Sequence, residues 1–360
     1  MGGAVQVANS FINELNQIDI NNQYLICYTK LSFPNLDKKV FSEKFKFVLL
    51  ESSPAMLSRR FKTIRKLYKI ENEFNPDLVF TLMGPSYWCP KTKHVCGFAD
   101  GWVYNPNSIA YTRLSFSNRI KRKLLNKIKK YRLKKEASIY ILETNDAKEK
   151  FSKYLKINSS KISVVSNTYN SVFRNPIANK SKFFDNNSFK LLSLSAFYPN
   201  KNLEIINSVL EFIPKELDVK FYLTLPNDIF NKKFNKSDKI INLGVKHIDD
   251  CPELIYSCDV IFLPTLLETF SASYPEAMVM NKPILTSGYS FAKSICGDAA
   301  EYFDPLKPKE IAEKIIYIMN NKKRYNELVD LGAKKVLTFP TARQRAIQYL
   351  EILNNNIINL

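Results

Sequence analysis

Short apolar runs alternate with longer amphipathic stretches along most of this chain. The runs have the length and composition of buried strands, and the stretches between them repeat apolar residues at helical spacing. In the first half, this pattern predicts strands at 24–28, 47–50, 78–82, 94–98, 138–142 and 162–165 and helices at 4–17, 57–74, 117–134 and 146–155. In the second half, it predicts strands at 190–194, 219–225, 239–243, 260–263 and 283–286 and helices at 201–213, 250–257, 275–281, 308–335 and 341–353. Alternation of this kind predicts two doubly wound α/β domains.

The boundary between the two domains falls in a polar segment without periodicity, Asn175 to Ser188. A chain of 360 residues is long enough for two domains with separate cores. We therefore expect an N-terminal Rossmann-like domain at 1–175 and a C-terminal one at 176–340, with a final helix in 341–360. The active site of such a pair is expected in the cleft between the domains.

The start of the chain is unusual for this fold class. Gly2 and Gly3 lead directly into the first predicted helix, whereas such a glycine pair normally follows a strand and permits close approach of a ligand. Either the natural start lies upstream, or the sheet lacks its first strand. The glycine pair alone is a weak signal, and an unstructured start is the simpler interpretation.

Two carboxylates eight positions apart, Glu268 and Glu276, follow the apolar run 259–263, which Pro264 ends. The pattern predicts a strand end followed by a helix start, where free backbone N–H groups and the helix dipole favour anionic phosphates. One carboxylate could then reach sugar hydroxyls while the other accepts hydrogen bonds from a ribose. An ordinary strand–loop–helix unit has the same spacing, so spacing alone leaves both interpretations open.

Composition indicates a globular protein. Hydrophobic residues make up 45% of the chain, yet no run reaches the roughly 20 apolar residues of a membrane span. Without a recognisable signal peptide, we expect a cytoplasmic protein with reduced thiols. The six cysteines lack zinc spacing and there are only two histidines, so we expect no metal site.

The net charge of +19 is concentrated in one segment. Residues 119–135 hold ten cations and no acid, and Ile120, Leu124, Ile128 and Tyr131 recur at helical spacing. This pattern predicts a basic amphipathic helix that binds anionic lipid headgroups, and a basic cluster at 59–69 would extend the surface. A solvated helix face and a nucleic-acid contact are the alternatives, although the chain has no nucleic-acid reader motif. The expected membrane-binding residues are Arg119, Lys121, Arg122, Lys123, Lys127, Lys129 and Lys130.

The chain resembles the retaining GT-B glycosyltransferases of family 4, which transfer sugars from nucleotide donors. The likeness rests on the E-x7-E pair Glu268 and Glu276 and on further motif residues in both halves. These are Tyr198 to Leu203, Asn242 to Gly244, Leu254 to Tyr256, Ala277-Met278, Lys282-Pro283, Gly297 to Ala300 and, in the first domain, Val165 to Phe173. The resemblance implies two Rossmann-like domains facing a cleft, with the donor nucleotide on the second domain and the acceptor on the first. It also implies that the final helix, in 341–360, packs back on the N-terminal domain.

The resemblance also implies roles for particular residues. Glu276 would bind the ribose, and Lys201 would neutralise the diphosphate as a point charge. Glu268 would face the donor sugar, with backbone N–H groups nearby. Those N–H groups belong to Thr269, Phe270 and Ser271.

The sequence departs from the family pattern at three places. An arginine is common five residues before Lys201, where this chain has Ala196. Many relatives carry an adjacent His-Asp pair near the donor sugar; here His94 is the candidate for a catalytic role beside Lys201 and Glu268, and Asp100 is a weaker one. A histidine satisfied by local backbone is the alternative for His94. Thr269 and Ser271 replace the usual glycines after the first glutamate.

The resemblance implies retaining hexosyl transfer without a further cofactor. Because the chain has no Asp-x-Asp motif, we expect this activity to be metal-independent, and no side chain looks like a general base paired with a nucleophile. The protein would position its substrates and stabilise charge on the diphosphate. The acceptor would be a lipid-linked or cell-surface glycan of a bacterium, of O-antigen, lipopolysaccharide or capsule type, at the inner face of the cytoplasmic membrane. The alternatives are a GT-B sugar-nucleotide epimerase and a non-catalytic basic protein that binds membranes or nucleic acid.

Overall fold

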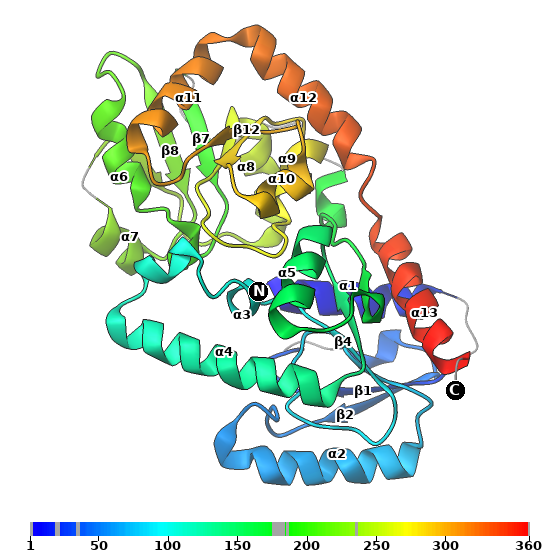
Figure 1. Ribbon diagram of the computed structural model, residues 1–360. Coiled ribbons are helices and arrows are strands. Elements are labelled where there is room, and N and C mark those ends of the chain that lie inside the picture. Colours follow the sequence, from blue (N-terminus) through cyan, green and yellow to red (C-terminus); the bar gives the residue numbers. More distant parts are fainter. Residues whose placement is uncertain are drawn as a thin grey trace. The chain divides into compact units, whose positions relative to one another are not determined.

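The computed structural model of the chain consists of two compact units (Figure 1). It describes residues 3–18, 22–33, 37–174, 184, 187–234 and 237–358. Unit 1 contains Met1–Ala99, Leu124–Ser166 and Thr341–Leu360, and unit 2 contains Asp100–Lys123 and Asn167–Pro340. Residues 100–123 thus group with unit 2, outside the range 176–340 expected for the second domain. Met1 and Gly2 and most of the expected linker lie outside the described residues.

Unit 1 contains two parallel sheets. Strand β1 (Tyr24–Tyr28) pairs with β2 (Phe45–Leu49). The second sheet has the order β3-β4-β5-β6, with β3 at Val79–Thr81, β4 at His94–Gly97, β5 at Ile139–Leu142 and β6 at Ile162–Val164. Its helices are α1 (Gly3–Gln17), α2 (Arg60–Phe74), α5 (Asn145–Leu155), α13 (Ala342–Ile358) and the larger part of α4 (Phe116–Glu136).

The last helix belongs to unit 1 because its apolar face packs on α1. The Phe11 and Tyr349 rings lie 5.2 Å apart between centroids, and Arg345 Nη2 donates to Ser10 Oγ at 3.0 Å. Ala346 of α13 is fully buried in the same core as Val95. The first and last helices therefore pack together through small and aromatic residues at helical spacing.

Unit 2 is one six-stranded parallel sheet with the order β12-β11-β10-β7-β8-β9. The strands are β7 (Phe189–Ser193), β8 (Val219–Leu223), β9 (Ile240–Asn242), β10 (Val260–Leu263), β11 (Ile284–Ser287) and β12 (Glu301–Phe303). Its helices are α3 (Gly101–Tyr104), α6 (Ile205–Val209), α7 (Asn227–Lys233), α8 (Cys251–Ser257), α9 (Ser273–Val279), α10 (Ser290–Cys296), α11 (Pro308–Asn320) and α12 (Lys322–Val336). The central strand β10 is buried throughout, as its continuous apolar run predicts.

The expected class, two doubly wound α/β domains with parallel sheets, is confirmed, with local differences. The helix expected at 308–335 is two helices, because Asn321 leaves helical geometry (φ −114°, ψ 81°) and its side chain caps α12 by accepting from Arg324 N. The helix expected at 201–213 starts later, since Asn202 is left-handed with φ 55°. Strand β12 and the short helices α3, α7 and α10 were not predicted, because runs of three to seven residues carry little periodicity.

Within the described residues, no helix combines the length and apolarity needed to cross a bilayer.

Candidate active site

The strand order of unit 2 defines where a ligand would bind. Strands β7 and β10 are neighbours, although the chain passes through β8 and β9 between them. Connections from the two strands lead to opposite directions along the sheet, so their carboxyl ends form a topological switch point, the usual ligand site of open α/β sheets. The turn η6 (Pro199–Lys201) follows β7, and residues 264–272 follow β10. Lys201 and Glu268, 67 positions apart, therefore meet at this point.

Hydrogen bonds lock these two segments together. Asn200 O accepts from Leu266 N at 2.7 Å, and Asn200 Nδ2 donates to Leu267 O at 2.8 Å. The Lys201 ammonium forms an ion pair with the Glu268 carboxylate, and both side chains are largely buried. Asn202 Nδ2 donates to Pro305 O at 3.0 Å, which holds the left-handed residue that ends the turn. The pair is therefore positioned by backbone contacts on both sides.

Glu276 is the fourth residue of α9 and is 9% exposed. Burial raises the pKa of its carboxyl to about 7. No donor among the described residues hydrogen-bonds this carboxylate, although the Cys251 thiol is close enough to feel its charge. The pKa of Cys251 rises to about 12, first through burial and then through the Glu276 charge. A buried carboxyl without a donor is typical of a ligand site.

Thr269, Phe270 and Ser271 are each 8% exposed, between the two glutamates. The Phe270 ring belongs to the core of unit 2 and packs edge-on against Phe339 at 6.0 Å. Of Phe270, only the backbone can therefore serve a ligand.

A segment from the first half of the chain lies against residues 264–272. An added Cβ at Gly101 would come within 3.5 Å of Glu268 O and Thr269 Cγ2, and Ala110 is buried with Leu266 and Leu267. The Asp100 carboxylate, a weaker candidate from the sequence, accepts from Trp102 N at 3.2 Å and pairs with Arg122 at 3.7 Å. This packing was not predicted from the sequence. The available signal was the pair Asp100-Gly101 shortly after the end of β4, where the Asp100 side chain caps α3.

His94 is a buried residue of unit 1. It is the first residue of β4, 3% exposed, and both ring nitrogens are in hydrogen bonds, Nε2 with Thr81 Oγ1 at 2.9 Å and Nδ1 with Glu136 O at 2.7 Å. Burial lowers its pKa. The amino end of a parallel strand is opposite the edge where ligands bind. These contacts favour the alternative of a histidine satisfied by local hydrogen bonds, and the catalytic role stays a prediction.

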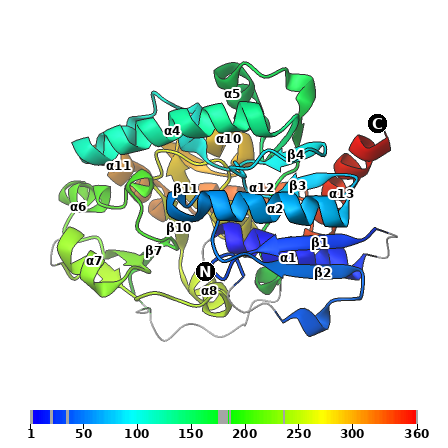
Figure 2. The same ribbon diagram turned by 90° about the horizontal axis from the view of Figure 1, so that it is seen from below.

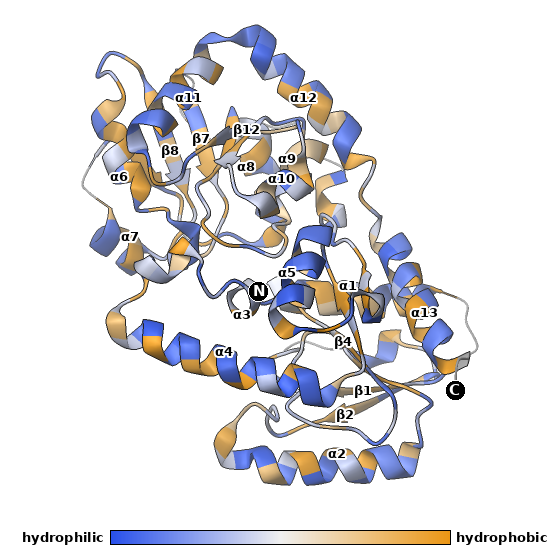
Figure 3. Cartoon of the chain, viewed as in Figure 1, coloured by the Kyte–Doolittle hydropathy of each residue, from blue (hydrophilic) through white to orange (hydrophobic). Residues whose placement is uncertain are grey.

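The basic helix α4 presents its apolar stripe to solvent. Ile120, Leu124, Ile128 and Tyr131 are 52%, 59%, 42% and 61% exposed, and blue and orange alternate along α4 in Figure 3. The side buried in the chain carries Asn126, Leu133 and Glu136 instead. Exposed apolar stripes flanked by cations are unusual for a purely solvated helix.

The seven expected membrane-binding cations of α4 differ in their contacts and in their exposure. Arg119 Nε donates to Tyr111 O at 3.0 Å, Arg122 pairs with Asp100, Lys123 lies over the Tyr111 ring, and Lys130 lies 3.8 Å from the Tyr154 ring centroid. Lys121 and Lys127 are exposed, and Lys129 is half-buried.

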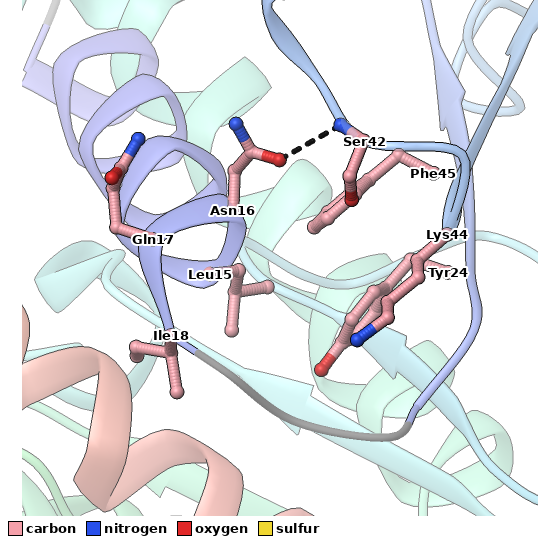
Figure 4. Close-up of a pocket in the computed structure, with 8 residues that line it drawn as sticks. All are labelled: Leu15, Asn16, Gln17, Ile18, Tyr24, Ser42, Lys44 and Phe45. Atoms are coloured by element: carbon pink, nitrogen blue, oxygen red, sulfur yellow. Dashed lines mark hydrogen bonds between the residues drawn. The ribbon is translucent and has the colours of Figure 1, made fainter.

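A cavity of about 210 Å³ lies in unit 1, away in the sequence from the predicted donor-site residues (Figure 4). Its lining residues are Leu15, Asn16, Gln17, Ile18, Tyr24, Ser42, Lys44 and Phe45. Tyr24 and Phe45 are the first residues of β1 and β2, so the cavity lies at the amino ends of these strands. It contains none of the predicted site residues.

A metal site in a protein needs several donor side chains close together. In the parts of the chain that the structure describes, no group of three or more His, Cys, Asp or Glu side chains could hold a metal ion.

Comparison with known proteins agrees with this architecture. The family model described as Glycosyl transferases group 1 matches residues 175–335. A glycosyltransferase from Rickettsia africae is similar in structure, with a TM-score of 0.74 and 16% identity over 99% of this chain and 95% of that chain. HepE from Anabaena in complex with UDP-glucose has a TM-score of 0.72 and 13% identity, over 99% and 96% of the two chains.

WaaG, a glycosyltransferase involved in lipopolysaccharide biosynthesis, is similar with a TM-score of 0.71 and 12% identity over 98% of this chain and 96% of that chain. No curated protein matches the sequence. At these identities the solved structures establish the fold. Residues 175–335 thus match the glycosyl transferases group 1 model, and the chain has the GT-B fold.

Proposed function

We propose that the protein is a retaining, family 4 type glycosyltransferase that uses a nucleoside-diphosphate sugar. Two observations carry the proposal, in a chain of which residues 175–335 match the group 1 model. The Lys201–Glu268 ion pair lies at the switch point, and the buried Glu276 carboxyl, eight positions after Glu268, has no hydrogen-bond donor among the described residues. The similar HepE structure contains UDP-glucose, which makes a nucleoside-diphosphate sugar the first donor class to test.

Each residue has a proposed role. Glu276 accepts hydrogen bonds from the ribose hydroxyls, and Glu268 faces the donor sugar while orienting Lys201 toward the diphosphate. Backbone N–H groups of residues 269–271 contribute to anion binding. No side chain acts as a nucleophile in this scheme: the acceptor oxygen attacks C1 from the side of the leaving group, the bond from C1 to the phosphate oxygen breaks, and the acceptor proton passes to a phosphate oxygen.

Catalysis then depends on positioning and on stabilising charge on the leaving diphosphate. We also propose that this reaction needs no metal. Full activity in excess chelator is the expected result, and lost activity that added divalent cation restores would contradict it.

The acceptor is proposed to be a lipid-linked or cell-surface glycan, handled at the cytoplasmic face of an anionic membrane. The exposed apolar stripe of α4 and its dense positive charge support this proposal. Leu57 and Phe61, at and near the start of α2, are 79% and 82% exposed beside the basic cluster 59–69. Arg60 lies over the Tyr87 ring, and Tyr87 N donates to Glu136 at the end of α4. The basic cluster 59–69 and the end of α4 therefore both contact Tyr87 in unit 1.

The donor proposal is tested by thermal unfolding with a panel of nucleotide sugars, because a ligand of the native state raises the melting temperature. We expect one nucleotide family to stabilise the wild type and Glu276→Ala to abolish the shift. Radiolabelled sugar should then transfer to a membrane glycan extract. Donor turnover without any acceptor would instead indicate an epimerase, and the absence of any nucleotide-sugar binding would refute the proposal.

The membrane proposal is tested by sedimentation with vesicles of phosphatidylglycerol and phosphatidylcholine. Each Lys or Arg near an anionic surface contributes about 1 kcal/mol, so reversing Lys121, Lys127, Lys134 and Lys135 to Glu should lower binding at least ~100-fold. The matched control reverses four exposed lysines elsewhere, Lys232, Lys309, Lys323 and Lys334, and should bind much more strongly than the α4 variant. Equal binding by both variants would sink the idea.

A further inference from the structure

The charge at the switch point is balanced before any donor binds. The Lys201 ammonium is paired with the Glu268 carboxylate, and Ala196 stands where the family that the sequence resembles often has an arginine. A nucleoside diphosphate sugar brings two negative charges, and the departing diphosphate carries more. If the proposed function holds, a further cation must therefore lie near this point.

The turn η3 (Ile109–Arg113) is in the right place to supply it. This turn lies against η6, which carries Lys201. Its Ala110 is fully buried with Leu266 and Leu267, just before Glu268. The turn thus contacts both segments that flank the switch point, and Arg113 is its last residue.

Arg113 differs from the other arginines of this segment. Arg119 donates to a backbone carbonyl and Arg122 pairs with Asp100, so both guanidinium groups are occupied. Arg113 is exposed, and no carboxylate of the described residues pairs with it. The turn that carries it is fixed at its start, where the Ser108 side chain accepts from Ala110 N at 3.3 Å.

The surroundings of Tyr289 indicate where the Arg113 guanidinium lies. Tyr289 follows the carboxyl end of β11 and packs with Ala110, Leu266 and Leu267. The pKa of Tyr289 is raised by burial and by the Asp304 charge, and the positive charge of Arg113 opposes this rise. The Arg113 guanidinium is therefore near enough to Tyr289 for its charge to act on the phenol, and Tyr289 follows β11, the neighbour of β10.

We infer that Arg113 binds the diphosphate of the nucleotide-sugar donor, in place of the arginine that this chain lacks at position 196. A guanidinium suits this task because its planar N–H groups can bind two phosphate oxygens at once, whereas an ammonium acts as a point charge. This inference deepens the proposed function and rests on it.

The test is calorimetric titration of Arg113→Ala and Arg113→Gln with UDP, GDP, ADP and dTDP, and with the matching nucleosides. We expect at least ~10-fold weaker binding of the diphosphate that the wild type binds, since hydrogen bonds to charged groups are worth about 1.5–3 kcal/mol. Nucleoside affinity should stay within about twofold, because the lost contact is to phosphate. Arg113→Lys should be intermediate, and the control Lys232→Ala should match the wild type.

The outcomes separate the two levels of the proposal. If the wild type binds no nucleoside diphosphate, the proposed function and this inference both fall. If the wild type binds one and both Arg113 variants bind it equally well, only the inference is overturned. An equal loss of nucleoside and diphosphate binding, or a lower melting temperature of the unliganded variants, would assign Arg113 a role in holding the turn and would also overturn it.

Discussion

His94 in unit 1 and Glu276 in unit 2 are both buried, titratable side chains, but their surroundings differ. Both nitrogens of His94 are in hydrogen bonds, with Thr81 and Glu136. The Glu276 carboxylate has no donor among the described residues. Burying a polar group costs free energy unless the group is hydrogen-bonded. The hydrogen bonds of His94 therefore account for its burial without a ligand. The comparison teaches that burial alone does not mark a candidate site, whereas a buried carboxyl without a hydrogen-bond donor, close in sequence to the carboxyl end of a parallel strand, does.

The largest effect should come from changes to the ion pair of Lys201 and Glu268. Glu268→Gln removes the charge that orients Lys201, and Lys201→Ala removes the cation itself. We expect each to lower kcat/KM of sugar transfer by at least ~100-fold, as for other groups that stabilise a developing anion. Steady-state kinetics with the identified donor measures this, and near wild-type rates would break the assignment of unit 2 as the donor site.

His94→Ala should act on stability instead of chemistry. The change leaves Thr81 Oγ1 and Glu136 O without their buried partner, which we expect to lower the free energy of unfolding by about 2–3 kcal/mol. Urea denaturation measures the loss, and kcat of the folded fraction should remain within about twofold of the wild type. A ~100-fold lower kcat at unchanged stability would restore the catalytic role and reverse the comparison.

The pH dependence of donor binding sharpens the role of Glu276. Ribose hydroxyls donate to the ionised carboxyl, whose pKa of about 7 lies above its usual value because of burial. Affinity should therefore be full above pH 7 and fall as the carboxyl is protonated, by about tenfold between pH 8 and pH 6. The Cys251 thiol, with a pKa of about 12, stays neutral over this range. Calorimetry of Glu276→Gln should show weaker binding and no such slope; a slope retained in the variant would assign the titration to another group.

Ionisation of Glu276 should also affect stability. A carboxyl whose folded pKa is raised disfavours the folded state once it ionises, so the wild type should lose stability relative to Glu276→Gln as pH rises from 4.5 to about 7. The loss should be at most ~3 kcal/mol, with no further change above pH 7. Melting temperatures across this range measure the difference, and parallel curves would mean that Glu276 is not desolvated in solution.

Periodicity was sufficient for most elements, because each is a local pattern. Strands such as β1 and β10 were predicted at their observed bounds. Strand β12 was missed because it has only three residues, and the break at Asn321 was missed because it depends on one capping side chain. Among the predicted site residues, the sequence placed Lys201 and Glu268 near one another only through a resemblance. Their ion pair spans 67 positions, a separation that no local pattern encodes.

The sequence by itself determined two α/β domains, a basic amphipathic helix and a glutamate pair beside a strand end, since alternation, charge and spacing are local properties. Tertiary structure decided the rest. It turned the apolar stripe of α4 outward, gave His94 hydrogen bonds at the amino end of β4, and brought residues 101–113 against residues 264–272. Which face is buried and which segments meet depend on packing between residues far apart in the chain, so only the folded molecule could show them.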